Sequence, residues 1–279
     1  MNRPSTSEVP PVVIAAGGLG TRVGNWSPYL PKELRPVGGR PGLTHIVDEV
    51  AAAGSDRTVV VHHPYYTPLI DWTRQVLGPG ALARYRTLTN QIPTQPKAAD
   101  RVRVEFIAQR GRYADVTSVL NGAEHLCTGE VYVVFADNVD PTHAALSSLG
   151  AATPPGIPAV LAAPFDLGLA ETHGVIICAG EGSVRTMVDL IEKPSRGQAA
   201  RLAADCGVDN LRLLRGRMRV TPRLLDYLSA SEQNLITEPK LSLVLAAYAK
   251  VYRVDVVTST RPFIDLGVPS LARELVQGG

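Results

Sequence analysis

VVIAAGGLGTRVG, residues 12–24, joins a short apolar run to a glycine-rich stretch. Val12 to Ala16 is typical of a buried strand, and Gly17 to Gly24 is typical of the loop that follows such a strand. Glycines let a backbone approach a ligand closely and present N–H groups to anionic oxygens. Arg22 adds a charge suited to a phosphate. The segment therefore indicates a phosphate-binding loop, with a plain glycine-rich connection as the alternative.

Two known nucleotide-binding motifs do not fit this segment. A Walker A loop ends in Gly-Lys-Ser/Thr, which does not occur here. The dinucleotide fingerprint requires a glycine at position 23, where this chain has Val23. It also requires an acidic residue at the end of the second strand, where this chain has His62 and His63. The sequence therefore disfavours a nicotinamide-dependent dehydrogenase.

Strand and helix patterns alternate along the rest of the chain, which indicates a largely parallel sheet with helices on its faces. We predict strands over residues 12–16, 58–61, 102–107, 131–135, 159–163, 174–178, 184–191, 211–220 and 254–257. We predict helices over residues 41–54, 69–77, 115–127, 221–228, 241–250 and 270–276. Because no linker rich in Pro, Gly or Ser divides the chain, we expect one domain with two lobes.

The composition is that of an ordinary globular protein. Of the 279 residues, 45% are hydrophobic and 19% are charged, and the net charge is +2. No basic run supplies the concentrated positive face that duplex nucleic acid requires, so we expect no nucleic-acid partner. Met1 to Pro11 lacks the pattern of a signal peptide, and no apolar run reaches the ~18 residues that cross a bilayer. We therefore expect no membrane contact and a cytoplasmic location.

Pro31-Lys32-Glu33 follows the glycine-rich loop within about a dozen residues. Lysine is a mobile point charge that can follow a phosphate through a displacement reaction. A single lysine in a loop is most often only solvated, but the closeness of Lys32 to the loop favours a role in binding phosphate.

GGLGTR at residues 17–22, followed by PKELRPVGGRP at residues 31–41 and a helix pattern, is very similar to the opening signature of the sugar-1-phosphate nucleotidylyltransferases. That family includes the UTP–glucose-1-phosphate uridylyltransferases and the glucose-1-phosphate thymidylyltransferases. The long segment between Tyr65 and Ala99 resembles the uridylyltransferase branch. Later landmarks occur in the family's order over nearly the whole chain: Gln109, Phe135-Ala136-Asp137, His173-Gly174-Val175, Glu192-Lys193-Pro194, Asp209-Asn210 and Phe263-Ile264-Asp265-Leu266-Gly267.

The resemblance implies a fold and a reaction. The fold is α/β, with a Rossmann-like mixed, largely parallel central sheet, helices on both faces and a smaller sugar-binding lobe. One nucleotidyltransferase domain covers residues 1–279, with a nucleotide-binding half at about 10–150 and a sugar-binding half at about 151–279. In the implied reaction a sugar 1-phosphate attacks the α-phosphorus of a nucleoside triphosphate, UTP being favoured, and pyrophosphate departs. Such a site acts mainly by neutralising charge and holding geometry.

The resemblance also implies roles for individual residues. Asp137 and Asp265 would hold Mg²⁺, although an isolated aspartate at such a position is more often a turn residue. Arg22 and Lys32 would stabilise the triphosphate and the departing pyrophosphate, and Lys193 would reach the sugar phosphate. The expected nucleotide contacts are Ala15, Ala16, Gly17, Gly18, Gly20, Thr21 and Gln109, and the expected sugar contacts are Gly174, Glu192 and Asn210.

Three segments depart from the family's pattern. Arg112 to Val116, which includes Asp115, replaces a small glycine-containing stretch near the base. Thr237 to Lys240 replaces an acidic segment of the sugar-side lobe, and Arg35 stands where the family has an apolar residue. Because the phosphate and metal positions survive while specificity positions vary, we expect an active enzyme with an unusual substrate.

Two other functions stay open at this point. The first is a dTTP- or CTP-using nucleotidylyltransferase with a different phosphorylated acceptor. The second is a catalytically silent regulatory protein that binds nucleotide sugars. The sequence also leaves a homo-oligomer open.

Overall fold

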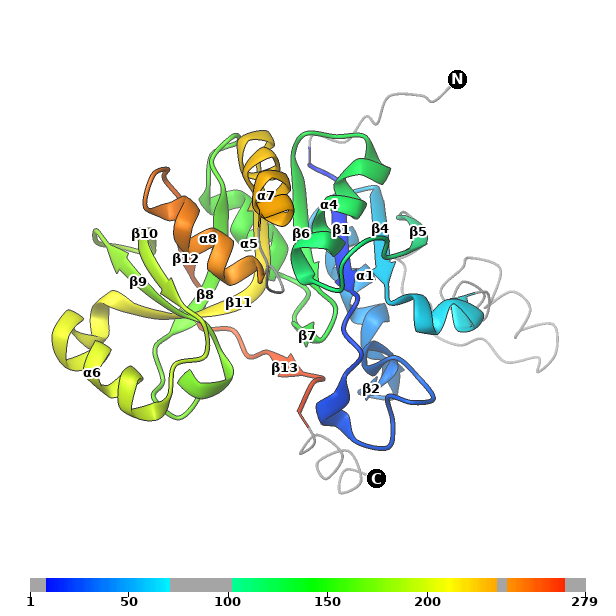
Figure 1. Cartoon of the computed structure of the whole chain (residues 1–279), viewed down its shortest axis with the longest axis horizontal. Coiled ribbons are helices and arrows are strands. Elements are labelled where there is room, and N and C mark those ends of the chain that lie inside the picture. The colour runs from blue at the N-terminus through cyan, green and yellow to red at the C-terminus, as the bar shows by residue number, and fades with distance from the viewer. Residues whose placement is uncertain (1–8, 71–101, 235–239, 269–279) are drawn as a thin grey trace.

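A nine-stranded mixed sheet runs through both halves of the chain in the computed structural model (Figure 1). The structure describes residues 9–70, 102–234 and 240–268. The helix predicted over residues 270–276 lies outside them, as do most of the helix predicted over residues 69–77 and most of the departing segment 237–240.

The strand order in the sheet is β5-β4-β1-β6-β11-β8-β12-β10-β9. Strands β5, β4, β1 and β6 are parallel, β11 runs antiparallel to β6 and β8, and β12 runs parallel to β8. This confirms the predicted mixed sheet, whose parallel pairings are those of β5, β4, β1 and β6 and of β8 with β12. The strands are β1 Val12–Ala16, β4 Arg57–His62, β5 Arg103–Ala108, β6 Val131–Phe135, β8 Ala159–Pro164, β9 Val175–Ala179, β10 Val184–Ile191, β11 Leu211–Val220 and β12 Asp255–Thr258.

Strand β1 forms because its residues are apolar on both faces, as a central parallel strand requires. All five of its residues are buried. Val13 lies beside Val59 of β4 and Val133 of β6, so three β-branched side chains meet in one row. Such side chains suit a pleated surface that is covered on both sides. The glycine-rich loop therefore starts at a fixed point on the carboxyl edge of the sheet.

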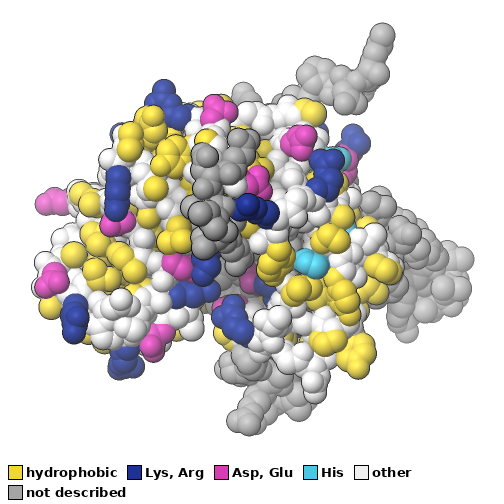
Figure 2. Space-filling model, viewed as in Figure 1, with side chains coloured by type: hydrophobic (Ala, Val, Ile, Leu, Met, Phe, Trp, Pro, Cys, Tyr) yellow, Lys and Arg dark blue, Asp and Glu magenta, His cyan; other side chains and the backbone are white. Residues whose placement is uncertain are grey.

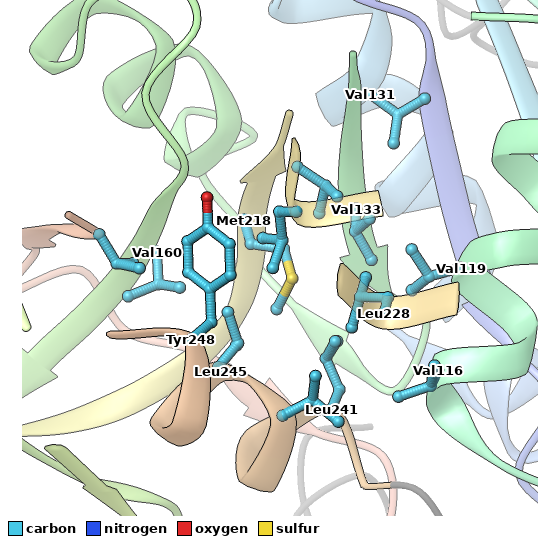
Figure 3. Close-up of a cluster of buried hydrophobic side chains, with 14 of the residues drawn as sticks. Val116, Val119, Val131, Val133, Val160, Met218, Leu228, Leu241, Leu245 and Tyr248 are labelled. Carbon is cyan, nitrogen blue, oxygen red and sulfur yellow. The ribbon is translucent and has the colours of Figure 1, made fainter. Parts of the chain in front are cut away.

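Helices cover both faces of the sheet (Figure 1). They are α1 Gly42–Ala52, α4 Asp115–Leu126, α5 Ala145–Ala152, α6 Arg196–Cys206, α7 Pro222–Asn234 and α8 Leu241–Ala249. Figure 3 shows the core on one face, where Val119 of α4, Leu228 of α7 and Leu245 of α8 approach Val133 and Met218 of the sheet. A second core packs α1 and α5 against the other face. Within the described residues, no helix is both long and apolar enough to cross a membrane.

Helices α5 and α6 were not predicted from the sequence. Ala199 is the only buried residue of α6, so this helix shows little hydrophobic periodicity. Its sequence signal is local instead. Ser195 and Gln198 form a capping box, in which the Ser195 side chain accepts from the Gln198 N–H and the Gln198 side chain accepts from the Ser195 N–H.

A two-residue strand pair joins the end of the described chain to its middle. Strand β7, Asn138–Val139, follows β6, and strand β13, Ile264–Asp265, pairs with it antiparallel. In Figure 1, β13 runs below the main sheet toward β7. Asp265 lies beside Asn138, and the Leu266 N–H donates to the Asp137 carbonyl at 2.7 Å. This pairing brings the two aspartates predicted to hold a metal to one place.

A buried ion pair fixes the position of β7. Arg217 of β11 and Glu49 of α1 are both fully buried, and the Arg217 Nε donates to the Glu49 carboxylate at 2.7 Å. The Arg217 Nη1 also donates to the Asn138 carbonyl at 2.6 Å. The Glu49 carboxylate also accepts from the Arg217 Nη2 at 2.5 Å and from the Leu146 N–H at 3.0 Å. The buried Arg217–Glu49 ion pair and its hydrogen bonds therefore link β11, α1, α5 and β7.

Arg217→Met should lower the free energy of unfolding by about 3–5 kcal/mol, because it leaves the Glu49 carboxylate buried without its counter-charge. The double variant Glu49→Leu/Arg217→Met should cost less than this single substitution. Urea denaturation followed by circular dichroism measures both. Arg110→Met, in an exposed ion pair with Glu124, is the control and should change stability by less than about 0.5 kcal/mol. A double variant less stable than Arg217→Met would contradict this account.

Candidate active site

The glycine-rich loop lies directly over the side chain of Lys32. A Cβ at Gly18 would lie 3.3 Å from Lys32 Cε and 3.5 Å from its Nζ. Gly20 has a φ of 62°, and a Cβ there would lie 2.6 Å from the Ser27 hydroxyl and 3.2 Å from Lys32 Cδ. Only glycine fits these two positions without displacing the lysine. The loop therefore brings its backbone N–H groups and the Lys32 ammonium to one surface.

Lys32 and Asp137 form an ion pair at the carboxyl edge of β6. The Lys32 side chain is 10% exposed and that of Asp137 is 25% exposed. Burial acts to lower the pKa of Lys32, but the negative charges of Asp137 and Glu33 outweigh it and raise that pKa. Burial acts to raise the pKa of Asp137, but the Lys32 ammonium outweighs it and lowers that pKa. Both groups are therefore charged at neutral pH, with the lysine held beside the loop.

Glu33 is a buried carboxyl group next to this pair. It is 2% exposed, neither of its oxygens has a hydrogen-bond partner among the described residues, and its Oε1 lies 3.5 Å from Lys32 Nζ. Burial raises the pKa of Glu33 to about 7, against the opposing attraction of Lys32. Glu33 therefore titrates near neutral pH inside the site.

Asp137 and Asp265 face one small space that Gly267 leaves open. A Cβ at Gly267 would lie 3.0 Å from Asp265 Oδ1, 3.7 Å from Asp137 Oδ2 and 3.5 Å from Arg22 Nη2. The Asp265 Oδ1 accepts from the Gly267 N–H at 2.7 Å. Within the described ranges, no group of three or more His, Cys, Asp or Glu side chains could hold a metal ion. The two carboxylates thus face one space, and a cation placed there would need further oxygens from elsewhere, such as a bound phosphate.

Arg35 holds the segment that carries Asp265. It is 6% exposed, and its Nη1 donates to the carbonyls of Leu266 at 2.7 Å and Val268 at 2.8 Å. An apolar residue at this position could not make these bonds. The departure from the family's pattern at Arg35 therefore has a structural explanation.

Two cavities of about 280 and 270 Å³ meet at Asp137, and we call them the first and the second cavity. In Figure 2, acidic and basic side chains gather in the middle of the face, between the two halves of the molecule. Both cavities are lined by Asp115, Phe135, Asp137, Glu192 and Lys193. Two ligands bound side by side would therefore meet at a boundary that carries Asp137 and Lys193.

The first cavity is lined by Ala15, Gly17, Gly18, Lys32 and Gln109, all predicted site residues. The Gln109 side chain is engaged within the protein. Its Nε2 donates to the carbonyls of residues 112 and 114, and its Oε1 accepts from the hydroxyl of residue 118. In this structure Gln109 therefore shapes the segment beside the cavity rather than pointing free donors into it.

Tyr113 closes the rim of the first cavity. The Leu19 N–H, in the glycine-rich loop, donates to the Tyr113 hydroxyl at 3.1 Å. The Tyr113 ring also packs edge-on against His63. A tyrosine oxygen thus accepts from a loop N–H of the kind that binds phosphate oxygens.

The second cavity contains Arg22, Gly174, Glu192, Lys193 and Asp265 from the predicted set. Lys193 has a φ of 45°, a left-handed conformation that is strained for a residue with a side chain. Its Nζ lies 3.6 Å from Glu192 Oε1. The lysine is thus held at the boundary between the cavities by an unusual backbone conformation.

Four predicted residues do not line either cavity. Ala16 is buried behind the loop, and Gly20 and Thr21 form the turn that leads to Arg22. Asn210 lies in a short 3₁₀ turn after α6, where its side chain donates to the Cys206 carbonyl and accepts from Arg185. The structure therefore does not bring Asn210 to the cavities.

His173 and Arg215 are among the polar side chains that line the second cavity and to which the sequence analysis assigned no role. The Arg215 Nη1 donates to the His173 Nε2 at 3.0 Å, so His173 carries its proton on Nδ1. Burial, and then the charge of Arg215, lowers the pKa of His173. The signal for Arg215 was the alternation of arginines at positions 215, 217 and 219 in a predicted strand.

The sequence profile of the MobA-like NTP transferase domain matches residues 12–220. The UTP–glucose-1-phosphate uridylyltransferase of Staphylococcus epidermidis is 22% identical over 237 residues, which are 82% of this chain and 78% of that protein. The bifunctional protein GlmU of Parvibaculum lavamentivorans is 44% identical over 73 residues, which are 26% of this chain and 16% of that protein. A structure of UDP-glucose pyrophosphorylase complexed with UDP-glucose has a TM-score of 0.75 at 19% identity, and the match covers 96% of this chain and 100% of that one.

Glu33→Gln should change how stability depends on pH. The raised pKa of Glu33 means that the folded state keeps its proton up to about pH 7, while the unfolded state loses it near 4.5. Wild-type stability should therefore fall, relative to the variant, as pH rises from 5 to 8, by up to about 3 kcal/mol. Urea denaturation at several pH values measures this difference. The exposed substitution Glu124→Gln is the control, and parallel curves for wild type and Glu33→Gln would show the idea to be wrong.

Proposed function

The chain belongs to the MobA-like NTP transferase domain family, and on that premise we propose that it joins a nucleoside triphosphate to a sugar 1-phosphate. The products are a nucleotide sugar and pyrophosphate. The observation that carries this proposal is the meeting of two cavities at Asp137 and Lys193, with the glycine-rich loop on one side and Glu192 on the other. A two-substrate displacement needs this arrangement, because both reactants must be held with their phosphates together.

The first cavity binds the triphosphate in this proposal. The backbone of Gly17 and Gly18 and the Lys32 ammonium face it. Arg22, exposed beside Gly267, supplies a second positive charge. The pyrophosphate that departs gains negative charge as its bond to the α-phosphorus breaks. Fixed cations that face this group stabilise the transition state more than the ground state.

The second cavity binds the sugar 1-phosphate. Lys193, at the boundary, pairs with the phosphate and holds its oxygen toward the α-phosphorus. The Glu192 carboxylate accepts hydrogen bonds from sugar hydroxyls. Gly174 lines the cavity beside it, where a Cβ would lie 3.0 Å from Leu190 Cδ1 and 3.5 Å from Glu192 Oε2. In this proposal the nucleotide-binding half at about 10–150 supplies most of the first cavity, and the sugar-binding half at about 151–279 supplies most of the second.

The space beside Gly267 fits Mg²⁺. Asp137 and Asp265 face the gap that a Cβ at Gly267 would enter, and carboxylate oxygens are the ligands that Mg²⁺ prefers. When bound there, the ion supplies positive charge to the phosphate oxygens. Lys32 is the counter-ion of Asp137 in this structure and lies within reach of the same phosphates.

UTP is the favoured nucleotide, because the Staphylococcus epidermidis relative is named for UTP and the similar solved structure holds UDP-glucose. The segment from Arg112 to Ala114 departs from the family's pattern and lies against the base side of the first cavity through Tyr113 and Ala114. A substrate panel therefore includes dTTP and CTP. The silent regulatory protein is disfavoured, because a binding protein needs neither the paired aspartates nor the cations that face the leaving group.

Asp137→Asn should lower pyrophosphate release by at least about 100-fold, because it removes a charge that positions the cation and Lys32. The assay measures pyrophosphate with Mg²⁺ for UTP, dTTP and CTP against a panel of sugar 1-phosphates. Asp205→Asn, an exposed substitution in α6, is the control and should keep wild-type activity.

Release that requires both substrates and is lost in Asp137→Asn would support the proposal. Release by Asp137→Asn at the wild-type rate would refute the proposed role of Asp137. An absence of release with every pair would favour a silent binder, which a thermal shift with each nucleotide would then identify.

A further inference from the structure

Arg215 differs from the other two arginines that alternate with it on β11. Arg217 pairs with Glu49, and Arg219 lies 3.5 Å from Glu130. Within the described part of the chain, Arg215 has no carboxylate within 4.0 Å, which is the distance that defines an ion pair. Burial lowers the pKa of Arg215, and the charge of Asp265, acting from beyond this distance, opposes that effect without cancelling it. A half-buried guanidinium without a direct counter-ion is unfavourable, and an anionic ligand would supply one.

The main chain is shaped to place Arg215 in the second cavity. Strand β11 pairs with β8 at Leu214↔Ala162 and again at Met218↔Val160, so β11 advances four positions while β8 advances two. The residues between them form a bulge, and bulges redirect side chains beside functional sites. Gly216 lets this bulge pack closely, because a Cβ there would lie 2.9 Å from the Phe135 Cβ.

The Arg215 guanidinium is oriented by neutral partners. The Arg215 Nη1 donates to the His173 Nε2 at 3.0 Å, and the Arg215 Cζ lies 5.3 Å from the centroid of the Phe263 ring. Its Nε is buried and has no hydrogen-bond partner among the described residues. A guanidinium has five N–H donors, and among the described residues the Arg215 side chain donates one hydrogen bond, to His173. Its charge therefore stays available for a ligand.

We propose that the second cavity selects a sugar 1-phosphate that carries a carboxylate, of the hexuronic acid type, and that Arg215 binds this carboxylate. The inference rests on the proposed function and names its substrate class. The 1-phosphate already has the Lys193 ammonium at the boundary between the two cavities. A singly charged planar carboxylate matches the fork of one arginine. The cavity is also lined by four carboxylate side chains, Asp115, Asp137, Glu192 and Asp265, which would repel a doubly charged second phosphate more strongly than a singly charged carboxylate.

The test compares glucuronic acid 1-phosphate with glucose 1-phosphate in the pyrophosphate assay. Wild type should prefer the uronic acid by at least about tenfold in kcat/KM, since a hydrogen bond to a charged group commonly contributes that much. Arg215→Gln should lower the value for the uronic acid by about 10–100-fold and change the value for glucose 1-phosphate by less than about threefold. Arg215→Lys should retain part of the preference.

Arg212→Gln is the matched control. Arg212 lies on the same strand outside both cavities, where it donates to the Thr258 hydroxyl and the Asp209 carbonyl, and its loss should leave the preference unchanged. An equal loss on both sugars in Arg215→Gln would overturn the inference, because it would place Arg215 on the phosphate that the sugars share. Turnover of glucose 1-phosphate without a preference for the uronic acid would overturn it while the proposed function stands.

Calorimetry separates the inference from the proposed function. Wild type should bind glucuronic acid 1-phosphate at least about tenfold more tightly than glucose 1-phosphate, and Arg215→Gln should bind the two equally. If neither sugar were turned over, this binding preference would still support the Arg215 site while the proposed reaction failed. Equal binding of the two sugars by wild type would overturn the inference whatever the activity.

Discussion

The antiparallel pairing of β7 with β13 is the contact on which the site depends. It joins a segment near residue 265 to the end of β6, so that Asp265 and Asp137 share the space left by Gly267. Arg217 holds the β7 side of this pair through the Asn138 carbonyl, and Arg35 holds the β13 side. Without the pairing, the two aspartates would not face one space beside Arg22.

The buried charges near this contact are neutralised within the protein, whereas the positive charges that line the cavities are not fully neutralised. Inside the protein the Arg217 guanidinium is neutralised by Glu49, because a buried charge without a partner destabilises the fold. At the cavities, Arg22 and Arg215 have no carboxylate partner within the described ranges, and the Lys32 ammonium pairs with an aspartate that a cation could also bind. Charges that are left available in this way suit anionic substrates, which complete the neutralisation only when they bind.

The sequence predicted what depends on local pattern. Apolar runs such as Val12 to Ala16 are strands because both sheet faces are covered, and residues that follow parallel strands meet at one edge, which is why Asp137 and the glycine-rich loop lie together. Other features depend on tertiary contacts. Helix α6 has one buried residue and no clear period, β7 and β13 are too short to show alternation, and the role of Arg215 depends on a bulge and on a missing counter-ion. Asn210 matched the family's order, yet its side chain bonds within its own turn.

The most direct test of the site is the binding of Mn²⁺, followed by electron paramagnetic resonance, in the presence of the nucleoside triphosphate that supports pyrophosphate release. The paired aspartates should hold one such ion together with the triphosphate, so wild type should bind Mn²⁺ more tightly with the nucleotide than without it. Asp265→Asn should lose this enhancement, and Asp205→Asn should keep it. If Asp265→Asn bound Mn²⁺ and nucleotide as wild type does, the pairing of β7 with β13 would not build a cation site, and the account would be wrong.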